Sequence, residues 1–285
     1  MKMSGGLTKK RSIFAYPYCI WSAIFIVIPL LLVVFYSFTK QGDSGYVFTL
    51  ENYKLVFNPL NWKVLYRSFI LAGGATILCI VVGYPVAYLI SKLPVSKRGT
   101  YILLFILPMW MNFLLRTYAW VAILGRNGLL NTFLGFLGIP AVTILYTNYA
   151  VLLGMVYNFL PFMVLPIYTS LSKMDDDLIN AAKDLGANGV TVFRKIIFPL
   201  SLPGVFSGVT MVFMPAVTTF AISRLLGGGR VMLVGDLIEQ QFTVVGDWSF
   251  GSAVSMCLMV IILLSMAFMS KYEDGAEKEG GGFLF

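Results

Sequence analysis

Six long apolar runs alternate with shorter polar segments along the chain. The runs cover approximately residues 13–38, 68–91, 100–124, 149–171, 202–222 and 248–270. Each run is close to the ~20 residues that a helix needs to cross ~30 Å of hydrocarbon. The first run is too long for the core of a signal peptide, and no small-residue cleavage site follows it. The pattern therefore predicts an all-α polytopic membrane protein with six transmembrane helices, the first of which is retained.

The segment from Asp175 to Pro203 is the longest regularly patterned polar stretch. In its first half, apolar side chains recur at helical spacing, at Leu178, Ile179, Ala182 and Leu185. Aspartates 175–177 suit the start of this helix, and Gly186 suits the left-handed turn that ends it. A second apolar face follows, made of Val190, Phe193, Ile196 and Ile197. Pro199 and Pro203 are expected to end the second helix. We predict two short amphipathic helices, forming either an ordinary interfacial hairpin or a docking element for another protein.

Three further polar segments lie at residues 1–12, 223–247 and 271–285. In 223–247, three glycines interrupt the chain at 227–229, and the alternation that follows predicts a half-buried helix. Its apolar positions are Met232, Leu233, Leu237 and Ile238. The segment is either a solvated loop with ordinary charges or the mouth of a pathway, where Asp236 and Glu239 attract a cationic substrate. The segment 271–285 is predicted to be a flexible tail.

Composition limits the chemistry that the chain can perform. It is 58% hydrophobic and 12% charged, with a mean hydropathy of +0.83, whereas soluble domains carry about 25% charged residues. The sequence has no histidine, which excludes His-based acid–base catalysis and His metal sites. Cys19, Cys79 and Cys257 lie far apart in apolar runs, as expected of small buried hydrophobic residues. We predict no catalytic residue, no metal and no cofactor.

The net charge of +8 is compatible with nucleic-acid binding or with a membrane orientation signal. With the amino terminus inside, 13 Lys and Arg residues lie inside and 7 outside, and Arg116 is left within a span. Cytoplasmic loops of membrane proteins carry the excess of Lys and Arg. The count therefore places both termini and the loop 172–200 in the cytoplasm and the segment 223–247 outside. We predict that the chain lies in a lipid bilayer and that it binds no nucleic acid.

Several residues within the spans are candidates for a transport pathway. Prolines 85, 108, 161, 166 and 215 tend to kink their helices, either for packing or around a pathway. Arg116 is the only charged residue within a span; it faces a cavity or partner, or it extends to the interface. The polar and aromatic candidates are Trp110, Asn112, Tyr118, Tyr157 and Asn158. Near span ends, Trp and Tyr also form interfacial belts.

The polar segment contains Asn180-Ala181-Ala182, then three residues, Gly186, nine residues, Ile196, one residue and Phe198-Pro199. This spacing resembles the EAA loop of ABC-importer permeases, whose pattern begins Glu-Ala-Ala and ends Leu-Pro. Asn180 replaces the Glu and Phe198 the Leu, so acidity at the loop would come from Asp184 or from aspartates 175–177. The resemblance implies the type I (MetI-like) permease fold with a cytoplasmic coupling-helix loop that docks on an ATPase. The residues that it assigns to coupling are Asn180, Ala181, Ala182, Asp184, Gly186, Ile196 and Pro199.

Longer segments resemble the permeases of polyamine importers, which carry spermidine and putrescine. These segments are MWMNFLLRTYAW, YNFLPFMVLPIYTSL, SRLLGGGRVMLVGDLIEQQF and DWSFGSA. The resemblance implies a bacterial inner-membrane complex with a second permease, two copies of an ATPase subunit and an extracytoplasmic substrate-binding protein. It also implies transport by alternating access. The chain has no GxxxxGK[ST] motif, so we expect ATP hydrolysis by the separate subunit and no enzyme activity in this chain.

Three alternatives stay open at this point. The first alternative, within the importer class, is that the substrate is sulfate, ferric iron or an opine-like compound. A permease for an anion would more typically line its mouth with Lys or Arg than with Asp236 and Glu239. A membrane enzyme would need a cluster of acids or nucleophiles at membrane depth. A secondary transporter or channel would normally show internal repeats, and the sequence shows no clear repeat. Pairing with a second copy or with a related permease is equally open.

Overall fold

The computed structural model describes residues 16–42 and 45–281, so the predicted tail at 1–12 lies outside this part. The chain divides into two compact units, residues 1–62 with 238–260 and residues 63–237 with 261–285. The predicted all-α class is confirmed, with one short β-hairpin in addition. Within the described residues, five helices are long and apolar enough to span a membrane, and a bent pair makes a sixth candidate. The five are Ile20–Ser37, Pro59–Ser91, Asn148–Ser172, Gly189–Thr218 and Trp248–Met269.

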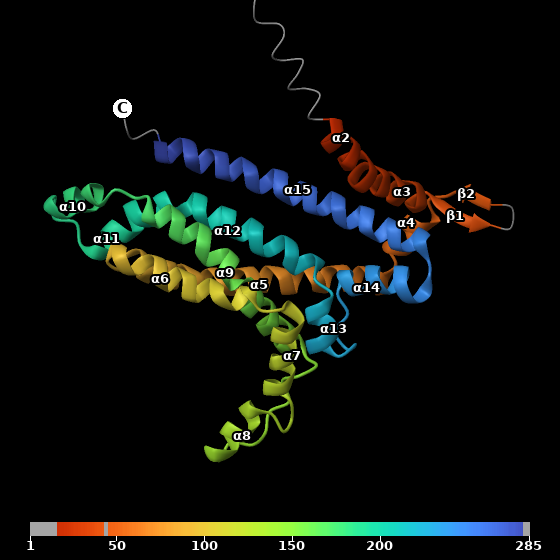
Figure 1. The fold of residues 1–285 in the computed structure, drawn as a ribbon, viewed down its shortest axis with the longest axis horizontal. Helices are drawn as coiled ribbons and strands as arrows, with labels where there is room; N and C mark the ends of the chain where they lie inside the picture. The colour runs from red at the N-terminus through yellow and green to blue at the C-terminus, as the bar shows by residue number, and fades with distance from the viewer. Residues whose placement is uncertain (1–15, 43–44, 282–285) are drawn as a thin grey trace, which may run out of the picture. The chain divides into compact units, whose positions relative to one another are not determined.

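The first unit contains the first span and the hairpin that follows it (Figure 1). Its complete elements are α2 (Tyr16–Ser22), a π-helical turn (Ala23–Val27), α3 (Ile28–Ser37), β1 (Thr39–Gly42), β2 (Gly45–Phe48), α4 (Glu51–Val56) and a second π-helical turn (Gln241–Val245). The strands pair antiparallel with Thr39 opposite Phe48. The unit also holds the first part of α15 (Trp248–Gly281), whose helix continues through most of the segment predicted to be a flexible tail.

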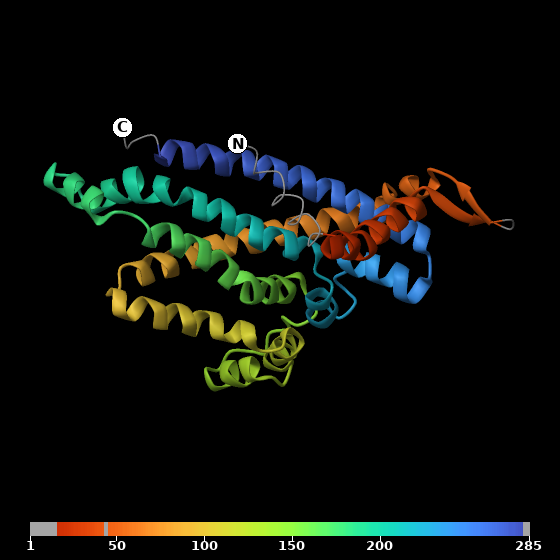
Figure 2. The same ribbon diagram turned by 45° about the horizontal axis from the view of Figure 1, so that its top comes forward.

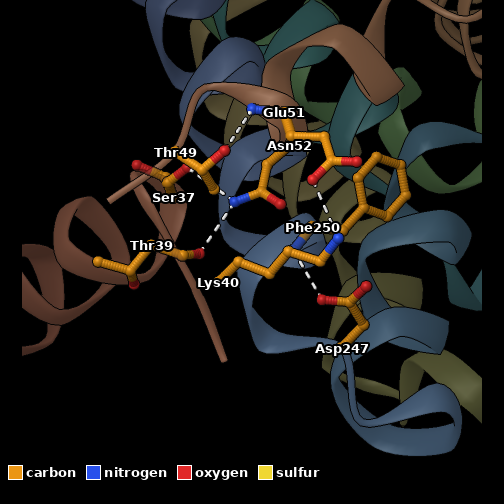
Figure 3. Close-up of polar contacts among 8 residues, drawn as sticks. All are labelled: Ser37, Thr39, Lys40, Thr49, Glu51, Asn52, Asp247 and Phe250. Atoms are coloured by element: carbon orange, nitrogen blue, oxygen red, sulfur yellow. Dashed lines mark hydrogen bonds and ion pairs between the residues drawn. The ribbon is translucent and has the colours of Figure 1, made fainter. Parts of the chain in front are cut away.

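The hairpin is fixed to the end of the first span by Asn52 (Figure 3). The Asn52 side chain is 3% exposed, and its amide donates hydrogen bonds to the carbonyls of Ser37 at 3.2 Å and Thr39 at 3.0 Å. Lys40 and Glu51 form an ion pair at 3.0 Å on the exposed side. A buried amide that satisfies two main-chain acceptors holds the strand and α4 in one arrangement. The sequence interpretation did not foresee this hairpin.

The second unit contains the remaining helices. They are α5 (Pro59–Ser91), α6 (Val95–Ile106), a 3₁₀ turn (Leu107–Trp110), α7 (Phe113–Leu124), α8 (Leu129–Phe136), α9 (Asn148–Ser172), α10 (Asp176–Asp184), α11 (Gly189–Val192), a π-helical turn (Phe193–Ile197), α12 (Phe198–Thr218), α13 (Ala221–Gly227) and α14 (Val234–Gln240). Helix α5 begins, and α14 ends, in the first unit. Helix α14 confirms the half-buried helix predicted in segment 223–247, with Leu233 and Leu237 buried.

Helices α9 and α12 form the centre of this unit and run side by side in both views (Figure 1 and Figure 2). Their close approach depends on glycine: a Cβ at Gly204 would lie 2.6 Å from the Pro166 carbonyl oxygen, and one at Gly208 would lie 2.7 Å from the Met163 sulfur. Small residues four apart commonly form such interfaces in membranes. A hydrogen bond of 2.8 Å between the Tyr84 and Ser201 hydroxyls joins α5 to the same pair.

We expect Gly204→Leu to lower the unfolding temperature of the detergent-solubilised protein. The new side chain would overlap the α9 backbone, and overpacking of this kind costs about 1–3 kcal/mol. Gly73→Leu is the matched control, because nothing lies within 4 Å of a Cβ at that helical position. Equal thermal stability of the two variants would contradict the packing described above.

The third span, predicted over 100–124 with a kink at Pro108, is broken into two helical segments. Helical segments Val95–Trp110 and Phe113–Phe136 meet at an angle of 88°. Pro108 lies just before the break, and the Asn112 side chain accepts hydrogen bonds from the N–H groups of Leu114 and Leu115. An amide that caps a new helix stabilises a restart, so Asn112 begins α7 instead of lying within a continuous span.

The second amphipathic helix of the polar segment continues directly into the fifth span. Pro199 and Pro203 do not end it, contrary to the sequence prediction, and helix runs from Gly189 to Thr218. The π-helical turn at Phe193–Ile197 precedes Pro199, with the Phe198 N–H bonded to the Phe193 carbonyl. A local π adjustment re-satisfies carbonyls that a proline leaves without a donor, which is why the helix passes this point.

Candidate functional site

In the segment 172–200 the first predicted helix is α10, and the second is α11 and the π-helical turn, which continue into α12; the segment lies at one end of the α9–α12 pair (Figure 1). Helix α10 begins at Asp176, and the Asp175 carboxylate accepts the Asp177 N–H at 2.9 Å. Asp176 and Asp177 lie in the first helical turn, where a carboxylate is stabilised by the helix dipole. Asn188 caps α11 through the Thr191 N–H at 2.8 Å. Each helix start is therefore defined by its own local sequence.

Gly186 makes the turn between the helices, as predicted. Its φ is +80°, in the left-handed region. The Gly186 N–H bonds to the Lys183 carbonyl at 2.8 Å, and the Ala187 N–H bonds to the Ala182 carbonyl at 3.0 Å. This pair of bonds is the Schellman arrangement, which satisfies the last carbonyls of α10 and reverses the chain. A side chain at this position would find open space, so the requirement for glycine comes from the backbone.

The helix pair has one packed side and one free side. Ile179, Val192 and Ile197 are buried against the rest of the unit. Leu178, Val190 and Leu185 are 48%, 69% and 90% exposed, although they are apolar. The predicted coupling residues lie mostly on this accessible side: Asn180, Ala181, Asp184, Gly186 and Pro199 are exposed, while Ala182 and Ile196 are half-buried. An exposed apolar surface within a polar loop is typical of a docking surface.

Contacts that the sequence interpretation missed tie this loop to the spans. Phe193 packs edge-on against Tyr84 and Tyr88 of α5, with ring centroids 5.9 and 5.8 Å apart. The Asp176 Oδ1 lies 3.8 Å from the Lys92 Nζ, and both side chains line a cavity of about 50 Å³. The four-residue spacing of Tyr84 and Tyr88, which places them on one helix face, was the available signal. The loop is therefore packed directly against α5.

Two of the predicted pathway residues are buried with an unmatched polar atom. Arg116 is 9% exposed, and its Nε has no hydrogen-bond partner within the described residues. Asn158 is 3% exposed; its amide donates to the Gly154 carbonyl at 2.9 Å, while its Oδ1 is unpartnered in the same part of the chain. Buried polar groups are normally paired. We therefore expect the Arg116 Nε and the Asn158 Oδ1 to find hydrogen-bond partners in another conformational state or in the assembled complex.

The aromatic candidates lie elsewhere on the unit. Trp110 and Tyr118 are 74% and 55% exposed. Tyr157 packs against Trp120, a residue outside the predicted set, with centroids 5.3 Å apart. Asn112 is occupied as the cap of α7. The structure thus places Tyr157 and Asn158 next to each other on α9, and it does not gather the whole predicted set at one place in this unit.

The two acids of α14 are both half-buried and take part in local hydrogen bonds. Asp236 accepts the Leu233 N–H at 2.9 Å, which caps α14. Glu239 accepts the Thr243 hydroxyl at 3.1 Å. Among the described residues, no three His, Cys, Asp or Glu side chains are grouped as metal ligands would be. These hydrogen bonds fix the positions of the two carboxylates.

Comparison with known proteins assigns the chain to a family. A family model described as "Binding-protein-dependent transport system inner membrane component" matches residues 6–275. The spermidine/putrescine transport system permease protein PotB of Haemophilus influenzae is 44% identical over 250 residues, which cover 86% of this chain and 87% of that protein. Both findings confirm the prediction of an importer permease over that of a membrane enzyme, channel or secondary transporter.

Solved structures agree on the fold. A bacterial ABC transporter involved in the import of the acidic polysaccharide alginate has a chain with a TM-score of 0.79 and 16% identity, covering 93% of this chain and 96% of that one. The MetNI methionine ABC transporter gives a TM-score of 0.58 at 16% identity, covering 77% and 98%. The predicted MetI-like permease fold is confirmed. The chain belongs to the family of binding-protein-dependent transport system inner membrane components, and it is the multi-pass permease subunit of an ABC importer that works with a binding protein and a separate ATPase.

Proposed function

We propose that this permease imports polyamines, spermidine and putrescine, across the bacterial inner membrane. The observation that carries the proposal is the 44% identity to the H. influenzae polyamine permease over 86% of the chain. The half-buried acids Asp236 and Glu239 agree with a cationic substrate, because fixed negative charge raises the local concentration of cations. The rings of Trp120 and Tyr157 offer faces on which an ammonium group is attracted.

The proposed complex contains this chain, a second permease, two copies of an ATPase subunit and an extracytoplasmic binding protein. Both termini and the loop 172–200 face the cytoplasm, as the distribution of Lys and Arg favours. The exposed side of α10 and α11, with Leu185 at its tip, then faces the ATPase. ATP binding closes the ATPase pair and moves the loop. Phe193 carries that movement to Tyr84 and Tyr88 of α5 and, through the continuous helix, to α12.

Uptake of labelled compounds by cells tests which substrate the permease carries. Cells that lack this chain but keep the other subunits should lose uptake of labelled spermidine and putrescine, and re-expression should restore it. Unlabelled polyamines should compete, whereas sulfate, ferric iron and an opine should not. Uptake of one of those compounds, without uptake of polyamines, would leave the assignment to the ABC importers intact and overturn the proposed substrate.

We expect Asp236→Asn and Glu239→Gln to raise the KM for a cationic substrate several-fold. Removing a charge near a cation weakens attraction by about 1 kcal/mol at a solvated site, and each amide keeps an oxygen that accepts the existing hydrogen bond. Glu51→Gln is the control, because it removes the same charge at an exposed position outside segment 223–247. Initial uptake rates over a range of substrate concentrations give KM, and unchanged values in both variants would remove these acids from the pathway.

A further inference from the structure

The cavity of about 50 Å³ beside the coupling loop lies within the second unit, where α5 and α9 end and α6 and α10 begin. Its polar lining includes Ser91, Lys92, Arg98, Ser172 and Asp176. Helices α5 and α9 are both long and apolar enough to span a membrane. The cavity therefore lies at a membrane surface in either orientation of the chain. A water molecule needs about 10–15 Å³ of such space, so a small polyatomic group fits.

Two cationic side chains line the cavity with donors that the chain leaves unused. Arg98 is half-buried, and its Nε donates to the Leu93 carbonyl at 2.7 Å. Within the described part of the chain, the two terminal nitrogens of Arg98 have no hydrogen-bond or ion-pair partner. The Lys92 Nζ lies 3.8 Å from the Asp176 Oδ1, which is beyond hydrogen-bonding distance. An ammonium and the outer fork of a guanidinium are thus available to an oxyanion.

The other polar groups of the lining leave this positive charge in excess. The hydroxyls of Ser91 and Ser172 already donate to carbonyls of their own helices, at 2.8 and 3.1 Å. The Asp176 side chain is 76% exposed, so water and salt screen its charge. Two cations therefore face one carboxylate that is largely solvated. The lining suits an anion with several oxygens, such as a phosphate group, and it does not suit a polyamine.

An apolar surface continues from the cavity along α6. Arg98 lies in the first turn of this helix, which belongs to the bent pair that makes the sixth candidate span. In the turns that follow, Tyr101, Leu103 and Leu104 are 48%, 50% and 59% exposed. A phospholipid matches both parts of this arrangement, because its phosphate is anionic and its acyl chains lie along apolar side chains. A free phosphate ion would use the cavity alone.

We propose that this cavity binds the phosphate of an anionic membrane phospholipid, with Arg98 and Lys92 as the donors. Basic pockets between transmembrane helices bind lipid headgroups in this way. The bound headgroup joins the end of α5 and the start of α6 to α10, where the chain itself supplies the 3.8 Å contact between Lys92 and Asp176. The inference does not depend on which substrate the importer carries.

Native mass spectrometry of the complete, delipidated complex titrated with phosphatidylglycerol tests the proposal. The variants are Lys92→Gln, Arg98→Gln and the double variant. We expect the dissociation constant of one tightly bound lipid to rise about tenfold or more in the double variant, since two charge-assisted contacts are lost. The same spectra should show all subunits in place. Arg98→Lys keeps the charge and should retain most of the affinity.

The matched control is the double variant Lys97→Gln/Lys173→Gln. It removes the same two charges from exposed positions near the cavity but outside its lining, and it should bind the lipid within about twofold of wild type. Phosphatidylcholine, whose headgroup has no net charge, should bind more weakly than phosphatidylglycerol at this site. Inorganic phosphate at the concentration of the lipid should not displace it.

Three results would overturn the inference. One is equal affinity for phosphatidylglycerol in the wild type and in Lys92→Gln/Arg98→Gln. Another is an equal loss of affinity in the control, which would reduce the effect to overall charge. The third is displacement of the lipid by equimolar inorganic phosphate, which would make this a site for the free ion. If the double variant does not assemble, Lys92→Gln decides alone, because the Lys92 ammonium makes no hydrogen bond within the described residues; unchanged lipid affinity there would also overturn the inference.

Discussion

A Gly186→Val importer is expected to insert and assemble but to take up substrate at less than about one fifth of the wild-type rate. Gly186 has a φ of +80°, and a β-branched residue is strained there, at about 1–3 kcal/mol. Differences of this size change an equilibrium by roughly 5- to 150-fold. The two helices would no longer keep the angle that the Schellman turn sets, so closure of the ATPase would reach the spans poorly. Uptake per inserted complex and ATPase activity are measured together.

Two control variants test whether the effect of Gly186→Val comes from the left-handed turn. Gly186→Asn should retain most transport, because asparagine enters the left-handed region more readily than other residues. Gly189→Val should also transport, since that glycine has no positive φ and nothing lies within 4 Å of a Cβ there. Wild-type uptake by Gly186→Val would show that the turn does not transmit movement.

The second large effect is expected from Leu185→Glu. Leu185 is 90% exposed at the tip of the coupling loop. If the ATPase covers this leucine, its burial contributes about 1.5–3 kcal/mol to docking, and a carboxylate in its place would be desolvated without a partner. We expect the ATPase subunits to dissociate from the purified complex at concentrations at which the wild type stays assembled. Size-exclusion chromatography with quantification of each subunit measures this.

Lys173→Glu is the matched control for Leu185→Glu. Lys173 is exposed at the start of the same loop, outside the apolar patch of Leu178, Leu185 and Val190. The control should stay assembled, since an exposed charge contributes little to binding. Stable assembly of Leu185→Glu would place the ATPase contact elsewhere on the chain.

The coupling loop was predictable from the sequence in most details. Its caps, its glycine turn and its helical periodicity are all local features, and each depends on residues within a few positions. The continuation through Pro199 was not predictable in this way. The π-helical turn at Phe193–Ile197 that accommodates the proline has no distinct residue pattern.

Long-range packing explains the other differences. Asn112 is polar and lies in an apolar run, so it was a reasonable pathway candidate, yet it caps a helix that restarts after an 88° break. The hairpin at 39–48 depends on Asn52, which is too far along the chain to be read as its partner. Arg116 and Asn158 were identified as unusual, but their burial and their unmatched atoms follow from neighbouring helices.

ATP-driven uptake by the purified complex in proteoliposomes tests the central claim most directly. The complete complex, supplied with the binding protein and labelled spermidine, should accumulate label inside only when ATP is hydrolysed on the side of the coupling loop. Omitting this chain, or replacing ATP with a non-hydrolysable analogue, should abolish accumulation. Accumulation that persists without this chain or without ATP would contradict the account, as would the absence of polyamine uptake by a complex whose ATPase is docked and active.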